Sequence, residues 1–245
     1  MAHASWIEHW PALAGSPAFA VPVTVVAYLL ANRVYERCGR ASMANPVLWS
    51  VAALAGAFLL SGTSYPLYFA GAQPIHFLLG PAVVALAWPL WERLHELRQR
   101  AWAITASALA GGLAGALSAV LIGWALGLPP EVLRSLAPKS VTAAAAISIS
   151  EQIGGIANLT TLFTLLTGLI GALTAKPLFD ALGVAAMPVR GFAMGTAAHG
   201  LGSARALQVD PDCGAYAVLA LLMQVVLASV LLPWLVPPLM RWLLG

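Results

Sequence analysis

Two long stretches of this chain contain no charged residue. Positions 41–91 are 51 residues without Asp, Glu, Lys or Arg, and positions 101–130 are another 30. A helix needs about 20 apolar residues to cross the hydrocarbon core of a bilayer. Only 9% of the whole chain is charged and 60% is hydrophobic, whereas a soluble domain has roughly 25% charged residues. The sequence therefore predicts an all-α integral membrane protein that forms a single membrane domain over residues 1–245.

The basic residues are concentrated in short loops. Twelve Lys and Arg against nine acidic residues give a net charge of +3, which is too small and too loop-bound to indicate a nucleic-acid partner. The segments 33–40 and 92–100 are rich in Arg, and such loops usually face the cytoplasm. Two predicted spans separate them, which places both loops on the cytoplasmic side and the N-terminus outside. Lys176 and Asp180, four residues apart, are expected to form an ion pair at a helix end.

The sequence carries no signature of catalysis or of metal binding. Cys38 and Cys213 are the only cysteines and have no metal-like spacing. The phosphate-, zinc- and hydrolase-type motifs of soluble enzymes are missing, and no residue cluster resembles a metal site. We therefore expect no cofactor, no metal and no enzymatic activity.

The hydropathy pattern predicts about eight transmembrane segments, two of them interrupted. Residues 1–15 are expected to form an interfacial helix, because Trp6, Trp10 and Leu13 recur at helical spacing. The other predicted regions are scaffold-type spans within 17–127 (about 17–32, 46–60, 74–91 and 101–126), a broken-helix transport core at 138–210 and a final span at 215–243. If either interrupted segment is re-entrant, the number of spans falls and the C-terminus changes sides.

The first interrupted segment, residues 138–161, reads PKSVTAAAAISISEQIGGIANLTT. A bilayer has no water for loose backbone groups, so an interrupted helix at that depth must face protein or a wet cavity. In a helical arrangement Ser140, Ser148 and Glu151 fall within one sector of about 80°, whereas Thr142 lies on another face.

The helix break in this segment is predicted at Gly154 and Gly155, because each glycine disfavours a helix interior by about 1 kcal/mol. Asn158 is then expected to cap a new helix. The N-terminus of a helix offers free N–H groups and a partial positive charge, which suit an anion. The hydroxyl of Ser150, just before the break, is a further candidate ligand for such an anion.

The second interrupted segment, residues 189–208, reads VRGFAMGTAAHGLGSARALQ. Thr196, His199 and Ser203 share one helical face, and a break is predicted at Gly200 and Gly202. Both segments open with a basic residue and place polar groups beside glycines. This pattern is typical of the crossing broken helices of inverted-repeat transporters.

Charged and titratable side chains in these segments have both functional and structural interpretations. The planar guanidinium of Arg205 can bind a carboxylate with two hydrogen bonds, and Glu151 and His199 are candidates for proton coupling. Alternatively, Glu151 pairs with Lys139 or Arg205 for structure, and His199 only joins two helices by a hydrogen bond. Lys139 and Arg190 are also candidates for anchors that extend to the interface.

The motifs KSVTAAAAISISEQIGG and RGFAMGTAAHGLGSARAL resemble the two signature regions of the LrgB/CidB family. The resemblance extends from about residue 46 onward and is closest over 138–207. It implies a bacterial inner-membrane protein with holin- or antiholin-like control of murein hydrolase activity and autolysis, often with a smaller LrgA/CidA-type membrane partner. Related proteins move glycolate, glycerate or pyruvate across membranes.

Together these features lead us to expect a secondary transporter or facilitator of small organic anions. It would work by alternating access, through rocking or elevator-like movement of the broken-helix unit, and a homodimer would supply a fixed scaffold. The predicted substrate-binding residues are Ser140, Thr142, Ser148, Ser150, Asn158, Thr196, His199, Ser203 and Arg205. The alternative is a regulator of autolysis that acts with an LrgA/CidA-type partner. A membrane-embedded enzyme is a third interpretation, which rests only on Glu151 and His199.

Overall fold

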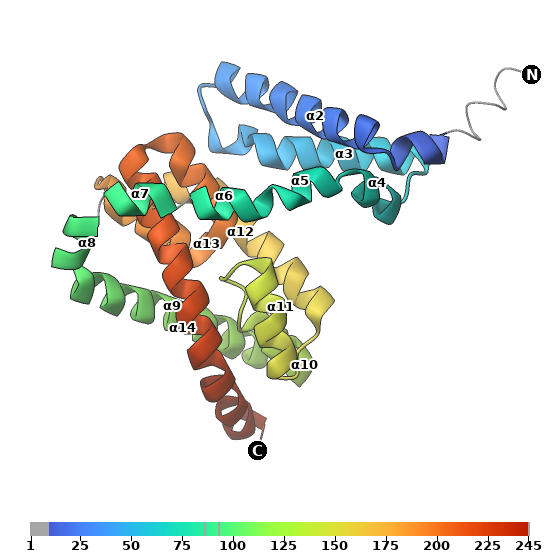
Figure 1. Ribbon diagram of the computed structural model, residues 1–245. Coiled ribbons are helices and arrows are strands. Elements are labelled where there is room, and N and C mark those ends of the chain that lie inside the picture. Colours follow the sequence, from blue (N-terminus) through green and yellow to red (C-terminus); the bar gives the residue numbers. More distant parts are fainter. Residues whose placement is uncertain (1–9, 86, 93, 245) are drawn as a thin grey trace, which may run out of the picture. The chain divides into compact units, whose positions relative to one another are not determined.

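The computed structural model describes residues 10–85, 87–92 and 94–244, and every regular element in these ranges is a helix (Figure 1). The all-α prediction is therefore confirmed for this part of the chain. The chain divides into two compact units, Met1–Ala87 and Trp88–Gly245. Most of the predicted interfacial helix, residues 1–9, lies outside the described residues, while residues 10–14 are helical.

The first unit is built on two long helices, α2 (Pro17–Arg37) and α3 (Pro46–Ser61), which lie side by side (Figure 1). The side chain of Asn45 begins α3 by accepting hydrogen bonds from the N–H groups of Val47 (2.9 Å) and Leu48 (3.3 Å). The other elements of this unit are short: η1 (Ser42–Ala44), α4 (Tyr65–Gly71), α5 (Gln73–Phe77) and α6 (Leu79–Ala85).

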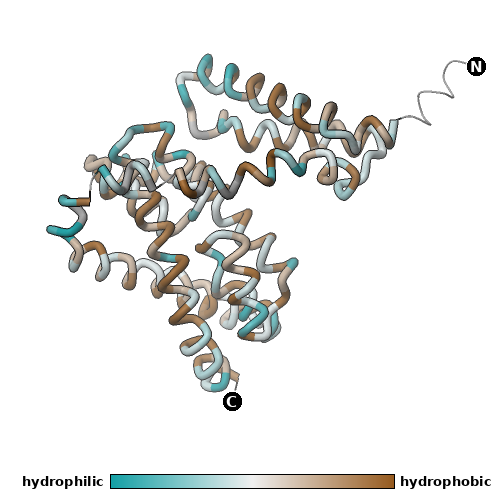
Figure 2. Tube along the Cα trace, in the orientation of Figure 1, coloured by the Kyte–Doolittle hydropathy of each residue, from teal (hydrophilic) through white to brown (hydrophobic). Residues whose placement is uncertain are grey.

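The second unit contains three long helices and two hairpins. Its elements are α7 (Ala87–Glu92), which begins at the boundary of the units, α8 (Leu94–Gln99), α9 (Ala101–Ala125), α10 (Pro130–Leu136), α11 (Ala143–Gln152), α12 (Ala157–Ala181), α13 (Met187–Val209) and α14 (Pro211–Leu244). Hydrophobic residues occur along the whole length of α14 (Figure 2). Large apolar side chains on the long helices are exposed, including Ile122 (61%) and Trp234 (79%). Lipid would cover such a surface.

Four described helices, α2, α9, α12 and α14, are long and apolar enough to cross a membrane. The bent pair of α3 and α4, with 119° between the two helices, raises the number to five if it forms one span. Eight spans were predicted. Within the segment predicted as a span at 74–91, α5 ends at Phe77 and α6 begins at Leu79, and Pro81, near the start of α6, has no backbone N–H to donate. Both interrupted segments form hairpins, which lowers the number further.

The first hairpin consists of α10 and α11, joined by a tip at residues 137–142. Its base lies at the end of α9, where a methyl group on Gly123 would come within 2.8 Å of the Leu133 side chain. Ile149 of α11 is buried in a cluster with Met240 of α14. The hairpin is therefore fixed between the C-terminal ends of α9 and α14.

The second hairpin is α13 itself, which is broken at His199 (φ 40°, ψ −130°). A Cβ atom on Gly202 would lie only 2.6 Å from the carbonyl oxygen of Met194. In an unbroken helix these residues, eight apart, would be about 12 Å apart along the axis. The segment 200–209 therefore folds back on 187–198.

Close backbone contacts join this hairpin to α14. A methyl group on Gly191 would overlap the carbonyl oxygen of Cys213, and one on Gly195 would overlap that of Ala217. Small residues four apart let helix backbones approach closely in membranes. The pair Gly191 and Gly195 fills this role between α13 and α14.

The two hairpins enter the second unit from opposite ends. The indole N–H of Trp124, at the end of α9, donates to the carbonyl oxygen of Leu243, at the end of α14, beside the first hairpin's base (3.1 Å). At the other end, Arg100 precedes α9 and lines a groove with Pro188 at the second hairpin's base. Figure 1 shows α14 passing α13 and then α11.

Replacing Gly195 by Ala is expected to lower the free energy of unfolding by about 1–3 kcal/mol, because the new methyl group overlaps the backbone of α14. The measurement is the unfolding of purified protein in detergent, followed by tryptophan fluorescence. Gly56→Ala in α3 is the matched control, because no atom lies within 4 Å of the added methyl group. Equal stability of the two variants would contradict the close contact.

Candidate functional site

One face of α9 meets the ends of both hairpins. A methyl group on Gly111 would come within 2.9 Å of the Thr196 methyl group, in the second hairpin. One turn further along α9, a methyl group on Gly115 would lie 3.7 Å from the Ser140 hydroxyl, in the tip of the first hairpin. Thr196 and Ser140, two of the predicted substrate-binding residues, thus contact neighbouring turns of the same helix.

Gln224 completes this central region from α14. Its side chain is 3% exposed and donates a hydrogen bond to the carbonyl oxygen of Ala108 (2.7 Å). It packs on Gly112, where a methyl group would overlap its amide oxygen. A cavity of about 30 Å³ beside Gln224 is also lined by Ser140, and this volume is enough for about one water molecule. Sequence reasoning missed Gln224, although it is a polar residue inside a long apolar helix.

His199 forms the tip of the second hairpin and bonds to α12. Its Nε2 atom lies 2.8 Å from the carbonyl oxygen of Thr164, and the absence of a side chain at Gly168 leaves room for the ring, because a methyl group there would come within 2.6 Å of it. The Ser203 hydroxyl donates to the His199 carbonyl oxygen (2.9 Å) and contacts that of Ala217 (3.2 Å). A positive φ is costly for a residue other than glycine, so these bonds hold a strained backbone.

The break between α11 and α12 is held by hydroxyl groups. Gly154 has φ 78° and Gly155 donates its N–H to the Ser150 carbonyl oxygen (2.7 Å). The Ser150 hydroxyl accepts a hydrogen bond from the Thr160 hydroxyl (2.7 Å). From α10, the Ser135 hydroxyl accepts the N–H of Ile156 (2.7 Å). Ser150, Thr160 and Ser135 are fully buried.

The prediction that Asn158 caps α12 is wrong. The helix begins at Ala157, with Ile156 in the capping position, and Asn158 lies exposed inside the first turn. Ile156 has no side-chain acceptor to cap the first turn, and its own N–H donates to Ser135 of α10. The second break is also displaced, since it is at His199 and not at Gly200 or Gly202.

Of the remaining candidate residues, Lys139 and Thr142 lie in the tip of the first hairpin, whereas Ser148, Glu151 and Arg205 lie away from the tips. Glu151, in the last turn of α11, and Ser148 are exposed, and Thr142 precedes α11 without a capping bond from its side chain. Lys139 donates to the Ser140 hydroxyl (3.3 Å). Arg205 is buried between the tip and the base of the second hairpin. Among the described residues, no three His, Cys, Asp or Glu side chains form a possible metal site.

A charged cluster closes the base of the second hairpin. The predicted ion pair of Lys176 and Asp180 is confirmed, with 2.6 Å between the charged atoms. Arg190 joins it, 2.7 Å from the other carboxylate oxygen of Asp180. Arg190 also donates to the Val184 carbonyl oxygen (2.6 Å) and lies over the Phe179 ring. In this structure Arg190 ties the α12–α13 loop together.

These features define a multi-pass membrane protein with two opposed hairpins, and comparison with known proteins gives its family. The LrgB-like family model matches residues 24–237. The chain belongs to this family.

The curated relatives cover nearly the same length. Holin-like protein CidB of Staphylococcus aureus (strain Mu50) is 32% identical over 214 residues, which are 87% of this chain and 93% of the relative. CidB of Staphylococcus epidermidis (strain RP62A) is 31% identical over 217 residues, with the same shares. Uncharacterized protein YxaC of Bacillus subtilis is 33% identical over 186 residues, covering 76% of this chain and 80% of that protein. No solved structure matches this chain.

Replacing Ser135 by Ala is expected to lower the free energy of unfolding by about 1 kcal/mol, because the N–H of Ile156 loses its acceptor. Hydrogen exchange of the Ile156 amide should also become faster. Ser118→Ala is the control, since the exposed Ser118 hydroxyl bonds only within α9. Unchanged exchange at Ile156 would show that Ser135 does not hold the break.

Proposed function

We propose that this chain is a holin-like protein of the bacterial inner membrane that regulates murein hydrolase activity and autolysis. The main support is the similarity to CidB, which covers 87% of this chain and 93% of the relative. The several apolar helices fit the membrane location. An LrgA/CidA-type membrane protein is the partner that the family resemblance favours.

The holin-like function predicts an effect on cell lysis. The chain is expressed with an LrgA/CidA-type partner in a bacterium that lacks its own pair. The rate of detergent-induced autolysis and the murein hydrolase activity released should then differ from those of cells with the partner alone. Gly195→Leu, which blocks contact between α13 and α14, should abolish the difference. Identical lysis with and without the chain would rule out this function.

Transport of small organic anions is the second candidate, and the two opposed hairpins favour it. In many secondary transporters, interrupted helices bring polar backbone and side-chain groups to a site near mid-membrane. Here Ser140 and Thr196 approach neighbouring turns of α9, and Gln224 adds an amide between α9 and α14. Glycolate, glycerate and pyruvate are the substrates that we propose.

The proposed transport mechanism is alternating access through movement of the hairpins. His199 would act as the pivot of the second hairpin, since its backbone is strained and its ring bonds to α12. When the protein opens to one side of the membrane, one hairpin would move away from α9 while the other hairpin stays packed against it. Glu151 and His199 remain candidates for proton coupling, at a hairpin base and a hairpin tip respectively.

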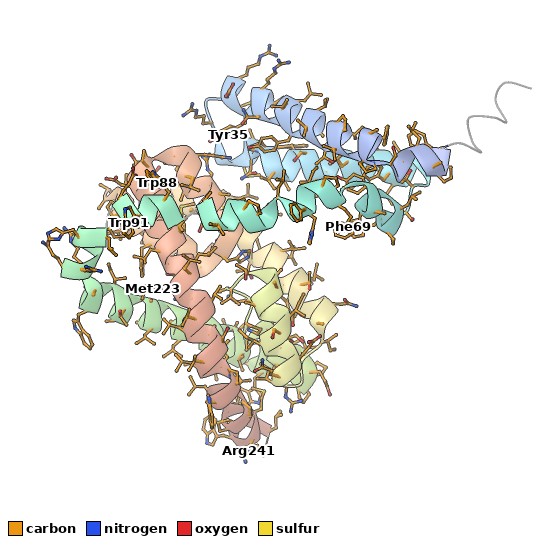
Figure 3. The ribbon with its side chains drawn as sticks, in the orientation of Figure 1. Tyr35, Phe69, Trp88, Trp91, Met223 and Arg241 are labelled. Atoms are coloured by element: carbon orange, nitrogen blue, oxygen red, sulfur yellow. The ribbon has the colours of Figure 1, made fainter. Side chains whose placement is uncertain are left out.

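Proteoliposomes containing the purified chain are expected to take up labelled glycolate, glycerate or pyruvate. Arg205→Ala should reduce uptake at least about tenfold, as expected for a lost charge-assisted hydrogen bond. Arg241→Ala is the control, because Arg241 lies exposed near the end of α14 (Figure 3). Absence of uptake for all three anions under any pH gradient would exclude this transport function.

A further inference from the structure

A separate cavity of about 140 Å³ lies between α12, α13 and α14. Its walls are largely apolar and include Phe179, Met187, Met194 and Val209. The two methionines come from the first arm of the second hairpin and Val209 from the last turn of the second arm. The cavity therefore opens between the arms of the hairpin and α12, away from the tips.

Three basic residues also line this cavity. They are Lys176 from α12 and Arg190 and Arg205 from α13, and none of the described residues that line it is acidic. Asp180 lies at its edge, where it bonds to Lys176 and Arg190. The capping carboxylate of Asp210 accepts the N–H groups of Asp212 and Cys213 at the start of α14.

The positions of the two arginines suit a ligand with a carboxylate group. Arg205 is 6% exposed, so its charge interacts in a medium of low dielectric constant. A guanidinium carries five N–H donors, and Arg190 uses two of them for Val184 and Asp180. A carboxylate that enters the cavity would compete with Asp180 for Arg190.

The volume and walls limit the rest of the ligand. An apolar protein cavity of about 150 Å³ is known to bind benzene, so 140 Å³ accepts an apolar body of that size. A hydroxylated body would lose hydrogen bonds to water against walls of Phe179, Met187 and Met194. An anion with an apolar body therefore fits better than a hydroxy acid.

We propose that the α12–α13–α14 cavity is a binding site for a small organic anion with a benzene-sized apolar body. Arg205 and Arg190 hold its carboxylate, and the Phe179 and Met side chains hold its apolar part. The site shares Arg205 with the proposed transport function, but binding of an anion to the purified chain requires neither lysis nor transport and can be measured separately from both.

The direct test is equilibrium dialysis of the purified full-length chain with labelled benzoate. Benzoate should bind saturably, whereas unlabelled benzamide and glycolate should compete poorly. Arg205→Gln and Arg190→Gln should each weaken binding at least about tenfold, the effect of one lost charge-assisted hydrogen bond. Arg205→Lys should bind with intermediate affinity, and Arg241→Gln should bind as the parent does. No saturable binding, or equal competition by benzamide, would overturn the proposal.

The location of the site can be tested with the thiol of Cys213, which lines the cavity and is buried. A Cys38→Ser protein contains only this thiol, and benzoate should slow its reaction with N-ethylmaleimide. The Cys213→Ala protein contains only the exposed thiol of Cys38, and benzoate should not slow its reaction with N-ethylmaleimide. Unprotected Cys213 at saturating benzoate would place binding elsewhere.

Loss of benzoate binding in nanodiscs that contain phosphatidylglycerol would identify a lipid headgroup as the occupant and would also overturn the proposal.

Discussion

The need to satisfy backbone polar groups inside protein governs both interruptions of this fold. A bilayer supplies no water to a broken helix, and here neighbouring side chains replace it. Ser135 accepts the N–H of Ile156 across the hairpin base, and Ser203 donates to the carbonyl oxygen of His199. The imidazole of His199 bonds to the Thr164 carbonyl group of α12. Each break therefore ends one helix and also links the chain to a neighbouring helix by hydrogen bonds.

Close backbone approach is the second condition for two hairpins inside one small unit. Glycines supply it where the helices meet: Gly111 faces Thr196, and Gly195 faces the backbone of α14. Without side chains at these positions, van der Waals contact and short polar bonds can hold helices that gain no hydrophobic stabilisation from lipid. The same contacts bring Ser140 and Thr196 to one face of α9.

Sequence patterns predicted the long helices and the existence of both interruptions, because hydropathy and glycine content are local properties. The helix predicted at about 101–126 is found at Ala101–Ala125, and the new helix predicted after the first break is found at Ala157–Ala181. The path of the chain after a break was not predictable, since it depends on the backbone of one residue, His199. The role predicted for Asn158 failed because α12 already begins at Ala157, which places Asn158 inside the first turn and not before it. Gln224 was missed because its partner Ala108 is 116 residues away.

Cysteine cross-linking in membranes tests the central arrangement, in which both hairpins reach the same face of α9. In a protein with Cys38→Ser and Cys213→Ala, the pairs Gly111→Cys with Thr196→Cys and Gly115→Cys with Ser140→Cys lie close enough for a disulfide. Both pairs are predicted to cross-link under mild oxidation, as detected by mass spectrometry of the peptides. The control pair Trp102→Cys with Ser140→Cys should not, because Trp102 lies at the opposite end of α9 from the first hairpin's base. Failure of both test pairs, or equal cross-linking of the control pair, would contradict the account.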